Sequence, residues 1–247
     1  MTAPTEKKQP RDSANWAGQV STLSVPDAPT QAVNLVEGRH LSGPLQGFGP
    51  MWQKTYSIQL NGLTLSPAEV VMAWKENFPR FWPPGNNFYG PITGLAPGEV
   101  ALLSMSVPVP GTPKLSTGVM VLYADDESFT FMTPEGHMFA GWITFSAYER
   151  GGAVVAQAQV LMRSADPILE LTLRMGGHRQ EDKFWQKTLQ NLARHLGAEG
   201  PVETQVVCVD PRIQWSQAKN IKYNVVMRST AHMIGAPVRW VRGRRAR

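Results

Sequence analysis

The sequence predicts an α+β fold in which a curved antiparallel sheet wraps around a long C-terminal helix. Two observations predict it. Several segments between residues 99 and 162 alternate apolar and polar side chains with the period of two that β-strands show. After residue 166 the period becomes helical, and the longest amphipathic stretch comes last. The order of strand, helix, several strands and long helix is that of a sheet packed on a helix.

The first strand and the first helix are marked by local signals. Residues 52–60 place Trp52, Lys54, Tyr56 and further apolar residues on one strand face, and a turn follows at residues 61–62. Residues 66–69 (SPAE) form a capping box with proline at the first helical position. The helix that opens there is expected to end near Pro79, because proline cannot continue it.

The middle of the chain predicts the body of the sheet, and each strand is bounded by turn residues. Gly151 and Gly152 supply a hairpin turn before the last of these strands. That strand carries Gln157 and Gln159 on one side, which predicts a sheet with one wetted face and one core face. The five predicted strands cover residues 99–108, 117–124, 129–133, 139–148 and 154–162.

Helical signals follow the sheet. Asp166 and Pro167 give a cap and a proline at the first helical position, and two glycines at 176–177 are expected to break or bend that helix. Residues 184–196 then carry an apolar stripe, with basic side chains in the last turn and Gly197 after it. This stretch predicts the long helix of the fold.

Charge is distributed unevenly along the 247 residues. The formal net charge is +5, yet residues 210–247 hold nine basic side chains and one acid, so residues 1–209 are mildly acidic. A domain that binds nucleic acid usually carries its basic side chains on the folded body. Because the basic excess lies in the C-terminal segment here, nucleic acid is disfavoured as a partner. We divide the chain into a leader (1–15), an irregular arm (16–50), a main domain (51–200) and a C-terminal extension with a basic tail (201–247).

Several functional classes are excluded or disfavoured by missing motifs. The single cysteine, Cys208, forms no intramolecular disulfide and no cysteine zinc site, and its apolar strand pattern predicts a buried thiol. Phosphate-binding glycine motifs and a Gly-x-Ser-x-Gly elbow are missing. His178, Glu181 and Asp182 have ligand-like spacing, but we favour a solvated helix start there. No cofactor and no metal is therefore expected.

The N-terminus shows no apolar stretch of a secretory signal, and no apolar run approaches the roughly 18 residues of a membrane span. These features predict a cytoplasmic protein, with peripheral membrane association as an option through its tail.

Four short stretches stand out along the predicted domain: WKENFP (74–79), FTFMTPEGH (129–137), GWITFS (141–146) and GHR (177–179). Together with the order of the elements, they resemble the START-like or SRPBCC superfamily, an uncharacterised bacterial branch of it. The resemblance spans residues 52–197, and it implies a helix-grip fold with an apolar cavity between sheet and long helix. Members of that superfamily include lipid carriers and polyketide cyclases, so the fold does not choose among functions.

Read with this resemblance, the aromatic and methionine-rich segments predict binding of a hydrophobic small molecule, such as a lipid or a polyketide-like compound. Polar anchors are expected among His137, Thr144 and Gln157, if their strand faces point inward. The predicted ligand-binding residues are Trp74, Phe78, Tyr89, Phe131, His137, Phe139, Trp142, Thr144, Gln157 and Trp185.

Two alternatives stay open at this stage. One is a cyclase or related enzyme that uses His137 as its acid–base group, although a turn role for this histidine is favoured. The other is a scaffold or membrane-docking protein that uses its basic tail, because arginines and an interfacial tryptophan suit an anionic surface. The oligomeric state is not predicted. The tail residues concerned are Arg239, Trp240, Arg242, Arg244, Arg245 and Arg247.

Overall fold

The computed structural model describes residues 20–25, 28–92, 94–106 and 114–236. Within them the strands form one eight-stranded antiparallel sheet, in the order β2-β3-β4-β5-β6-β7-β1-β8. The strands are β1 (Met51–Leu60), β2 (Asn87–Tyr89), β3 (Val100–Met105), β4 (Leu115–Ala124), β5 (Ser128–Met132), β6 (Phe139–Arg150), β7 (Ala153–Ser164) and β8 (Val202–Asp210).

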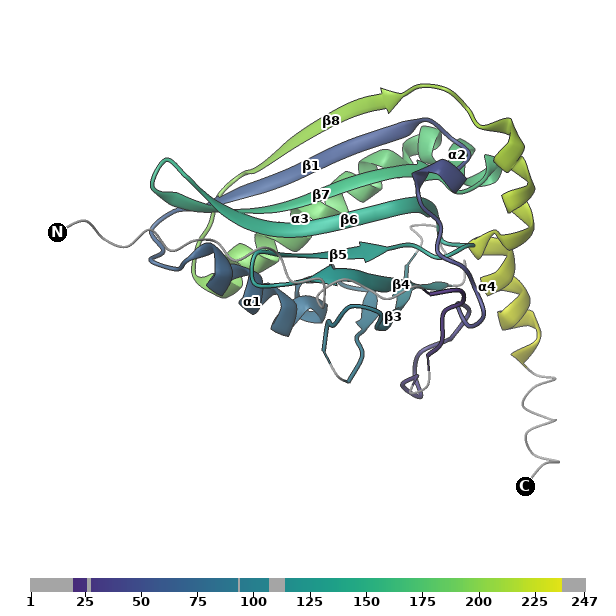
Figure 1. Ribbon diagram of the computed structural model, residues 1–247, viewed down its shortest axis with the longest axis horizontal. Helices are drawn as coiled ribbons and strands as arrows, with labels where there is room; N and C mark the ends of the chain where they lie inside the picture. The colour runs from purple at the N-terminus through teal and green to yellow at the C-terminus, as the bar shows by residue number, and fades with distance from the viewer. Residues whose placement is uncertain (1–19, 26–27, 93, 107–113, 237–247) are drawn as a thin grey trace.

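The helices are α1 (Pro67–Asn77), α2 (Pro167–Thr172), α3 (His178–Leu196) and α4 (Val225–Ile234). Shorter helical turns cover Pro44–Gln46, Phe78–Phe81 and Trp215–Tyr223, and a π-helical turn at Leu173–Gly177 joins α2 to α3. Figure 1 shows α3 lying across one face of the curved sheet and α4 standing at the sheet's end. This is a helix-grip fold, as the sequence predicted.

The sheet has two chemically different faces because strand side chains alternate. The inner face packs against α1 and α3, and the small Ala158 lies between Tyr56 of β1 and Phe145 of β6, its two register partners. The outer face carries Thr55 and Gln159, whose side chains hydrogen-bond at 3.2 Å. The predicted wetted face therefore exists.

Local signals formed the expected elements. The Ser66 side chain accepts a hydrogen bond from the Glu69 N–H, and the Ser66 N–H donates to the Glu69 carboxylate at 2.7 Å, which completes the predicted capping box. Gly197 ends α3 in the left-handed conformation with φ 86°. At Gly176, φ is 120°, outside the helical region, so the chain is kinked between α2 and α3 as the two glycines predicted.

Strand β8 pairs with β1 and extends the sheet beyond the long helix. Cys208 is exposed on this strand, so the predicted buried thiol is wrong. The reason is position: β8 is the edge strand, and its residues from Glu203 to Val209 are exposed on both faces. An apolar strand pattern does not distinguish an edge strand from a covered one.

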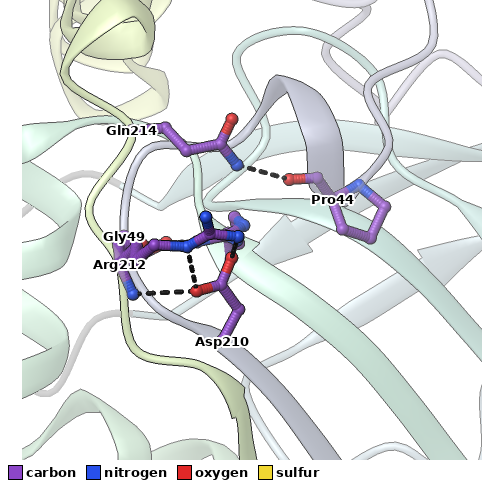
Figure 2. Close-up of polar contacts among 6 residues, drawn as sticks. Pro44, Gly49, Asp210, Arg212 and Gln214 are labelled. Atoms are coloured by element: carbon purple, nitrogen blue, oxygen red, sulfur yellow. Dashed lines mark hydrogen bonds and ion pairs between the residues drawn. The ribbon is translucent and has the colours of Figure 1, made fainter.

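The N-terminal arm and the C-terminal extension meet at one end of the sheet (Figure 2). The backbone N–H of Gln214 donates to the Phe48 carbonyl at 2.8 Å, and the guanidinium of Arg212 binds Asp210 at 2.9 and 3.0 Å. Buried Arg163 of β7 also reaches Asp210, at 2.6 Å. Polar contacts thus join the arm and the extension at this end of the sheet.

Candidate ligand cavity

A cavity of about 1100 Å³ lies between the inner face of the sheet and α3. Strands β3 to β7 supply one wall, and α3 with the turn before it supplies the other. Most of the lining is apolar, and it includes Phe78, Trp82, Phe88, Phe131, Ile143 and Phe184. Its volume is that of a site for a drug-sized or larger molecule.

Edge-to-face packing holds the aromatic wall in place. The ring of Phe78, which follows α1, lies 4.9 Å from Phe88 and 5.2 Å from Phe131, measured between centroids. Trp82 stands 5.1 Å from Phe184 of α3, nearly perpendicular to it. Such pairs are favourable beyond the area they bury, so the wall is preformed.

The opening of the cavity combines apolar and polar groups. Met175 and Gly176 of the π-helical turn and Val226 of α4 contribute to the lining, and Met175 is largely exposed. Lys183 and Lys187 lie one helical turn apart on α3, and both are exposed while lining the cavity.

Six of the ten residues predicted to bind a ligand line this cavity: Phe78, Phe131, His137, Phe139, Trp142 and Trp185. Trp142 contributes from a strand position on the outer face, where its ring lies beside Gly43 of the arm. The structure therefore brings together residues that are 107 positions apart between Phe78 and Trp185.

The other four predicted residues lie elsewhere. Trp74 is fully buried in the core, with its ring 5.1 Å from Phe145, and Tyr89 packs with a separate apolar cluster. Thr144 hydrogen-bonds Thr130 at 2.9 Å, and Gln157 lines a polar groove of about 340 Å³ on the outer face. Thr144 and Gln157 thus point away from the apolar cavity.

His137 lines the cavity from the loop before β6, and it is buried. Its Nδ1 accepts a hydrogen bond from the Phe139 N–H at 3.0 Å, so the neutral ring carries its proton on Nε2. Burial lowers the pKa of His137 to about 4. The side chain is therefore neutral at pH 7 and closes the turn that the sequence indicated.

A buried charged cluster beside the cavity was not predicted as a site. Lys54 Nζ on β1 lies 2.9 Å from Glu181 Oε2 and 2.7 Å from Asp182 Oδ1, both on α3. The Tyr56 hydroxyl donates to the same Asp182 oxygen at 2.7 Å. The sequence held one signal: Lys54 shares a strand face with apolar residues, which places its ammonium group inside and requires a buried partner.

Glu181 is the member of this cluster that lines the cavity. Burial raises its pKa to about 7, against the opposing effect of Lys54. The neighbouring Tyr56 also has a raised pKa, because burial and then the nearby Glu181 carboxylate disfavour its phenolate. The solvated helix start expected here is therefore wrong: Glu181 is buried, and both Glu181 and Asp182 bind the buried Lys54 of β1, a partner 127 positions from Glu181 that local spacing does not reveal.

The described residues contain no group of three or more His, Cys, Asp or Glu side chains placed to hold a metal ion. Within the same part of the chain, none of the helices combines the length and apolar character needed to cross a bilayer. The predicted tail residues, Arg239, Trp240, Arg242, Arg244, Arg245 and Arg247, lie outside the described residues, as does the leader.

Comparison with solved structures finds proteins of similar fold. Ara h 8.0201 is 11% identical over 59% of this chain and 97% of its own, with a TM-score of 0.42. Protein Ms6760 from Mycobacterium smegmatis is 13% identical over 64% of this chain and 96% of its own, with a TM-score of 0.41. The di-domain ARO/CYC StfQ from the steffimycin biosynthetic pathway is 11% identical over 60% of this chain and 51% of its own, with a TM-score of 0.45.

At these identities the likeness concerns the fold and not the ligand or the reaction. No protein-family model matches the chain, and no curated protein matches it.

Proposed function

We propose that this protein binds a hydrophobic small molecule, of lipid or polyketide-like size, between its sheet and α3. The observation that carries the proposal is the cavity of about 1100 Å³ with its mostly apolar, aromatic-rich lining. Pockets of this kind bury most of a ligand's surface and orient it with a few polar groups. The apolar walls supply the affinity, because binding removes both surfaces from water.

Polar side chains are a minority of the cavity lining. Thr133, His137 and Glu181 lie in its wall, and Lys183 and Lys187 line it from α3. The other polar lining residues are Asn86, Ser106, Thr172, Gln180, Gln186 and Gln190. This distribution favours a molecule with an apolar body, a small number of internal polar atoms and one end that faces solvent.

The test compares two tryptophan variants on neighbouring positions of β7. Val160 lines the cavity, whereas Gln159 faces the outer groove. Native mass spectrometry of the full-length chain from its host should show a co-purifying mass of a few hundred daltons in wild type. Val160→Trp should remove that mass, and it should weaken binding of the fluorescent apolar probe 1-anilinonaphthalene-8-sulfonate by about tenfold. Gln159→Trp should leave both unchanged.

Equal probe binding by Val160→Trp and wild type would overturn the proposal. So would a wild-type protein that carries no extra mass and binds no apolar probe.

A second candidate function is acid–base catalysis on the bound molecule. It is favoured by one observation: His137 and Glu181 line the same cavity, with one pKa lowered to about 4 and the other raised to about 7. In this reading, the His137→Asn variant keeps an acceptor for the Phe139 N–H but abolishes turnover of a polyketide-like substrate. Its thermal midpoint should stay near that of wild type, and unchanged turnover would exclude His137.

A further inference from the structure

Two polar atoms in the cavity wall are buried and have no hydrogen-bond partner among the described residues: Glu181 Oε1 and the indole Nε1 of Trp82. Burying such a group without a partner costs free energy, and the cost is larger for a charged group. Buried polar groups in native structures are nearly always paired, so each exception calls for an explanation. Two of the four such atoms in the described residues line the cavity; the other two, Trp74 Nε1 and His178 Nδ1, do not.

The first atom is free because the rest of the Glu181 carboxylate is already used. Its Oε2 accepts a hydrogen bond from Lys54 Nζ at 2.9 Å, and Lys54 also binds Asp182 at 2.7 Å. One ammonium group thus faces two carboxylates. The Glu181 side chain is 6% exposed, so solvent does not provide the remaining partner.

The second atom belongs to a ring that is fixed on both sides. The Trp82 ring packs against Phe88 at 5.4 Å and Phe184 at 5.1 Å, and the residue is 8% exposed. Phe184 follows Glu181 by one turn on the same helix, so the indole and the carboxylate border neighbouring parts of the cavity. One atom can only donate a hydrogen bond, and the other, when ionised, can only accept one.

We propose that Glu181 and Trp82 are the polar anchors of the ligand, which is a hydroxylated, carbonyl-bearing apolar molecule. Its hydroxyl group donates to Glu181 Oε1, and its carbonyl oxygen accepts from Trp82 Nε1. This inference rests on the proposed binding function and deepens it, since it names the chemical class of the ligand. It also replaces Thr144 and Gln157, which face the other side of the sheet, as the groups that orient the molecule.

The Glu181 anchor is tested with two probes that differ by one donor, 2-naphthol and 2-methoxynaphthalene. Wild type should bind 2-naphthol about tenfold more tightly, as expected for a hydrogen bond to a charged acceptor. In Glu181→Gln, the amide oxygen should face Lys54 and the NH₂ group should face the cavity. The preference should then disappear or reverse. Gln157→Ala, on the outer face, should retain the wild-type preference.

The Trp82 anchor is tested with a second matched pair, 2-acetylnaphthalene and 2-ethylnaphthalene. Wild type should prefer the ketone by about threefold or more, as expected for a neutral hydrogen bond. Trp82→Phe keeps an aromatic ring but removes the N–H, and it should lose that preference while still binding 2-ethylnaphthalene.

The pH dependence of probe binding by wild type is an independent test of the Glu181 anchor. Protonated Glu181 is no longer a pure acceptor, so the preference for 2-naphthol should be larger at pH 8 than at pH 5.5. The groups that face Glu181 are Lys54 and Tyr56 of β1 and His178 and Asp182 of α3. Repeating the series with Glu181→Gln, which should be flat, separates Glu181 from them.

The outcomes distinguish this inference from the proposed function. If wild type binds neither member of a pair, the cavity does not take apolar molecules and the proposed function fails. If it binds both members equally at pH 8, the cavity is a binding site but Glu181 and Trp82 are not its anchors.

Discussion

Lys54 Nζ lies 2.9 Å from Glu181 Oε2, and the two side chains are 1% and 6% exposed. The pair joins β1 to α3, and it holds the long helix against the sheet at the point where the cavity reaches that side. Removing two charges from water costs several kcal/mol for each ion, so their attraction mainly offsets this cost. Its importance appears when one partner is removed.

Replacing Lys54 with methionine should therefore destabilise the protein strongly. The variant leaves Glu181 and Asp182 side by side without a cation, and breaking a buried pair in this way costs about 3–5 kcal/mol. Urea unfolding followed by tryptophan fluorescence measures the loss. The control is Lys219→Met, at an exposed lysine, which should change the free energy of unfolding by less than about 0.5 kcal/mol. Equal effects of the two substitutions would contradict a structural role for the Lys54–Glu181 ion pair.

The two buried titratable groups of the cavity should give opposite pH dependences of stability. The pKa of Glu181 is raised from 4.5 to about 7, so the folded protein holds a proton that the unfolded chain releases, and stability falls as pH rises between these values. The pKa of His137 is lowered from 6.5 to about 4, so stability rises with pH between these values. From pH 4.5 to 6.5 the two contributions oppose each other.

Single variants should separate these contributions. Relative to wild type, Glu181→Gln should gain stability between pH 4.5 and pH 7, by roughly 3 kcal/mol in total at 1.36 kcal/mol for each pKa unit. Relative to wild type, His137→Asn should lose stability as pH rises from 4 to 6.5, because only the wild-type histidine contributes stability that increases over this range. Urea titrations at pH 4.5, 5.5, 6.5 and 7.5 measure both slopes. A Glu181→Gln curve parallel to wild type would show that this carboxylate titrates normally.

Two helix caps are coupled through one hydrogen bond. Asp166 accepts from the N–H groups of Ile168 and Leu169 at the start of α2, and Asn224 caps α4 in the same way. The Asn224 amide also donates to the second Asp166 oxygen at 2.7 Å, and both residues are 1% exposed.

Each alanine substitution at these caps should cost about 1–2 kcal/mol. The double variant should cost less than the sum by about 1 kcal/mol or more, because the shared hydrogen bond is lost only once. A double-mutant cycle from urea unfolding gives the coupling energy. A coupling near zero would mean that α2 and α4 are capped independently.

Much of the fold follows from local patterns in the sequence, and the reason is physical. Alternation in residues 52–60 and 154–162 reports which side chains share a face, and Ser66, Asp166 and Gly197 mark helix ends by hydrogen bonds made within a few residues. The short strand β2 was not predicted, because three residues carry no measurable period. The choice of β1 as the partner of β8 carries no local signal, since pairing order is set by tertiary packing.

The site was only partly predictable for a related reason. Aromatic clusters identified the wall of the cavity but not which rings line it, so Trp74 and Phe78, four residues apart on one helical stripe, have different roles. The sequence did not show which face of each strand points toward the cavity. In the structure, Thr144 and Gln157 lie on the opposite face. Lys54 and Glu181 are 127 positions apart in the sequence, and no local pattern in the residues of α3 predicts their contact.

Arg163 of β7 should hold the C-terminal extension on the sheet through Asp210. The buried guanidinium donates to the Gly49 carbonyl at 2.5 Å, to the Arg212 carbonyl at 2.8 Å and to Asp210 at 2.6 Å. Hydrogen bonds from Arg212, and further from Arg163, hold the pKa of Asp210 well below its usual range. The Asp210 carboxylate is therefore ionised at neutral pH, where it balances the charge of Arg163.

Asp210→Asn removes this counter-charge while keeping the shape of the side chain. Amide hydrogen exchange in residues 211–223, followed by mass spectrometry at pH 7, should become faster, because the segment after β8 loses its attachment. Exchange in β5 and β6, at the centre of the sheet, should stay as slow as in wild type. Asp126→Asn, at an exposed turn, is the matched control and should change neither region. Unchanged exchange after β8 in Asp210→Asn would show that the Arg163–Asp210 ion pair does not secure the extension.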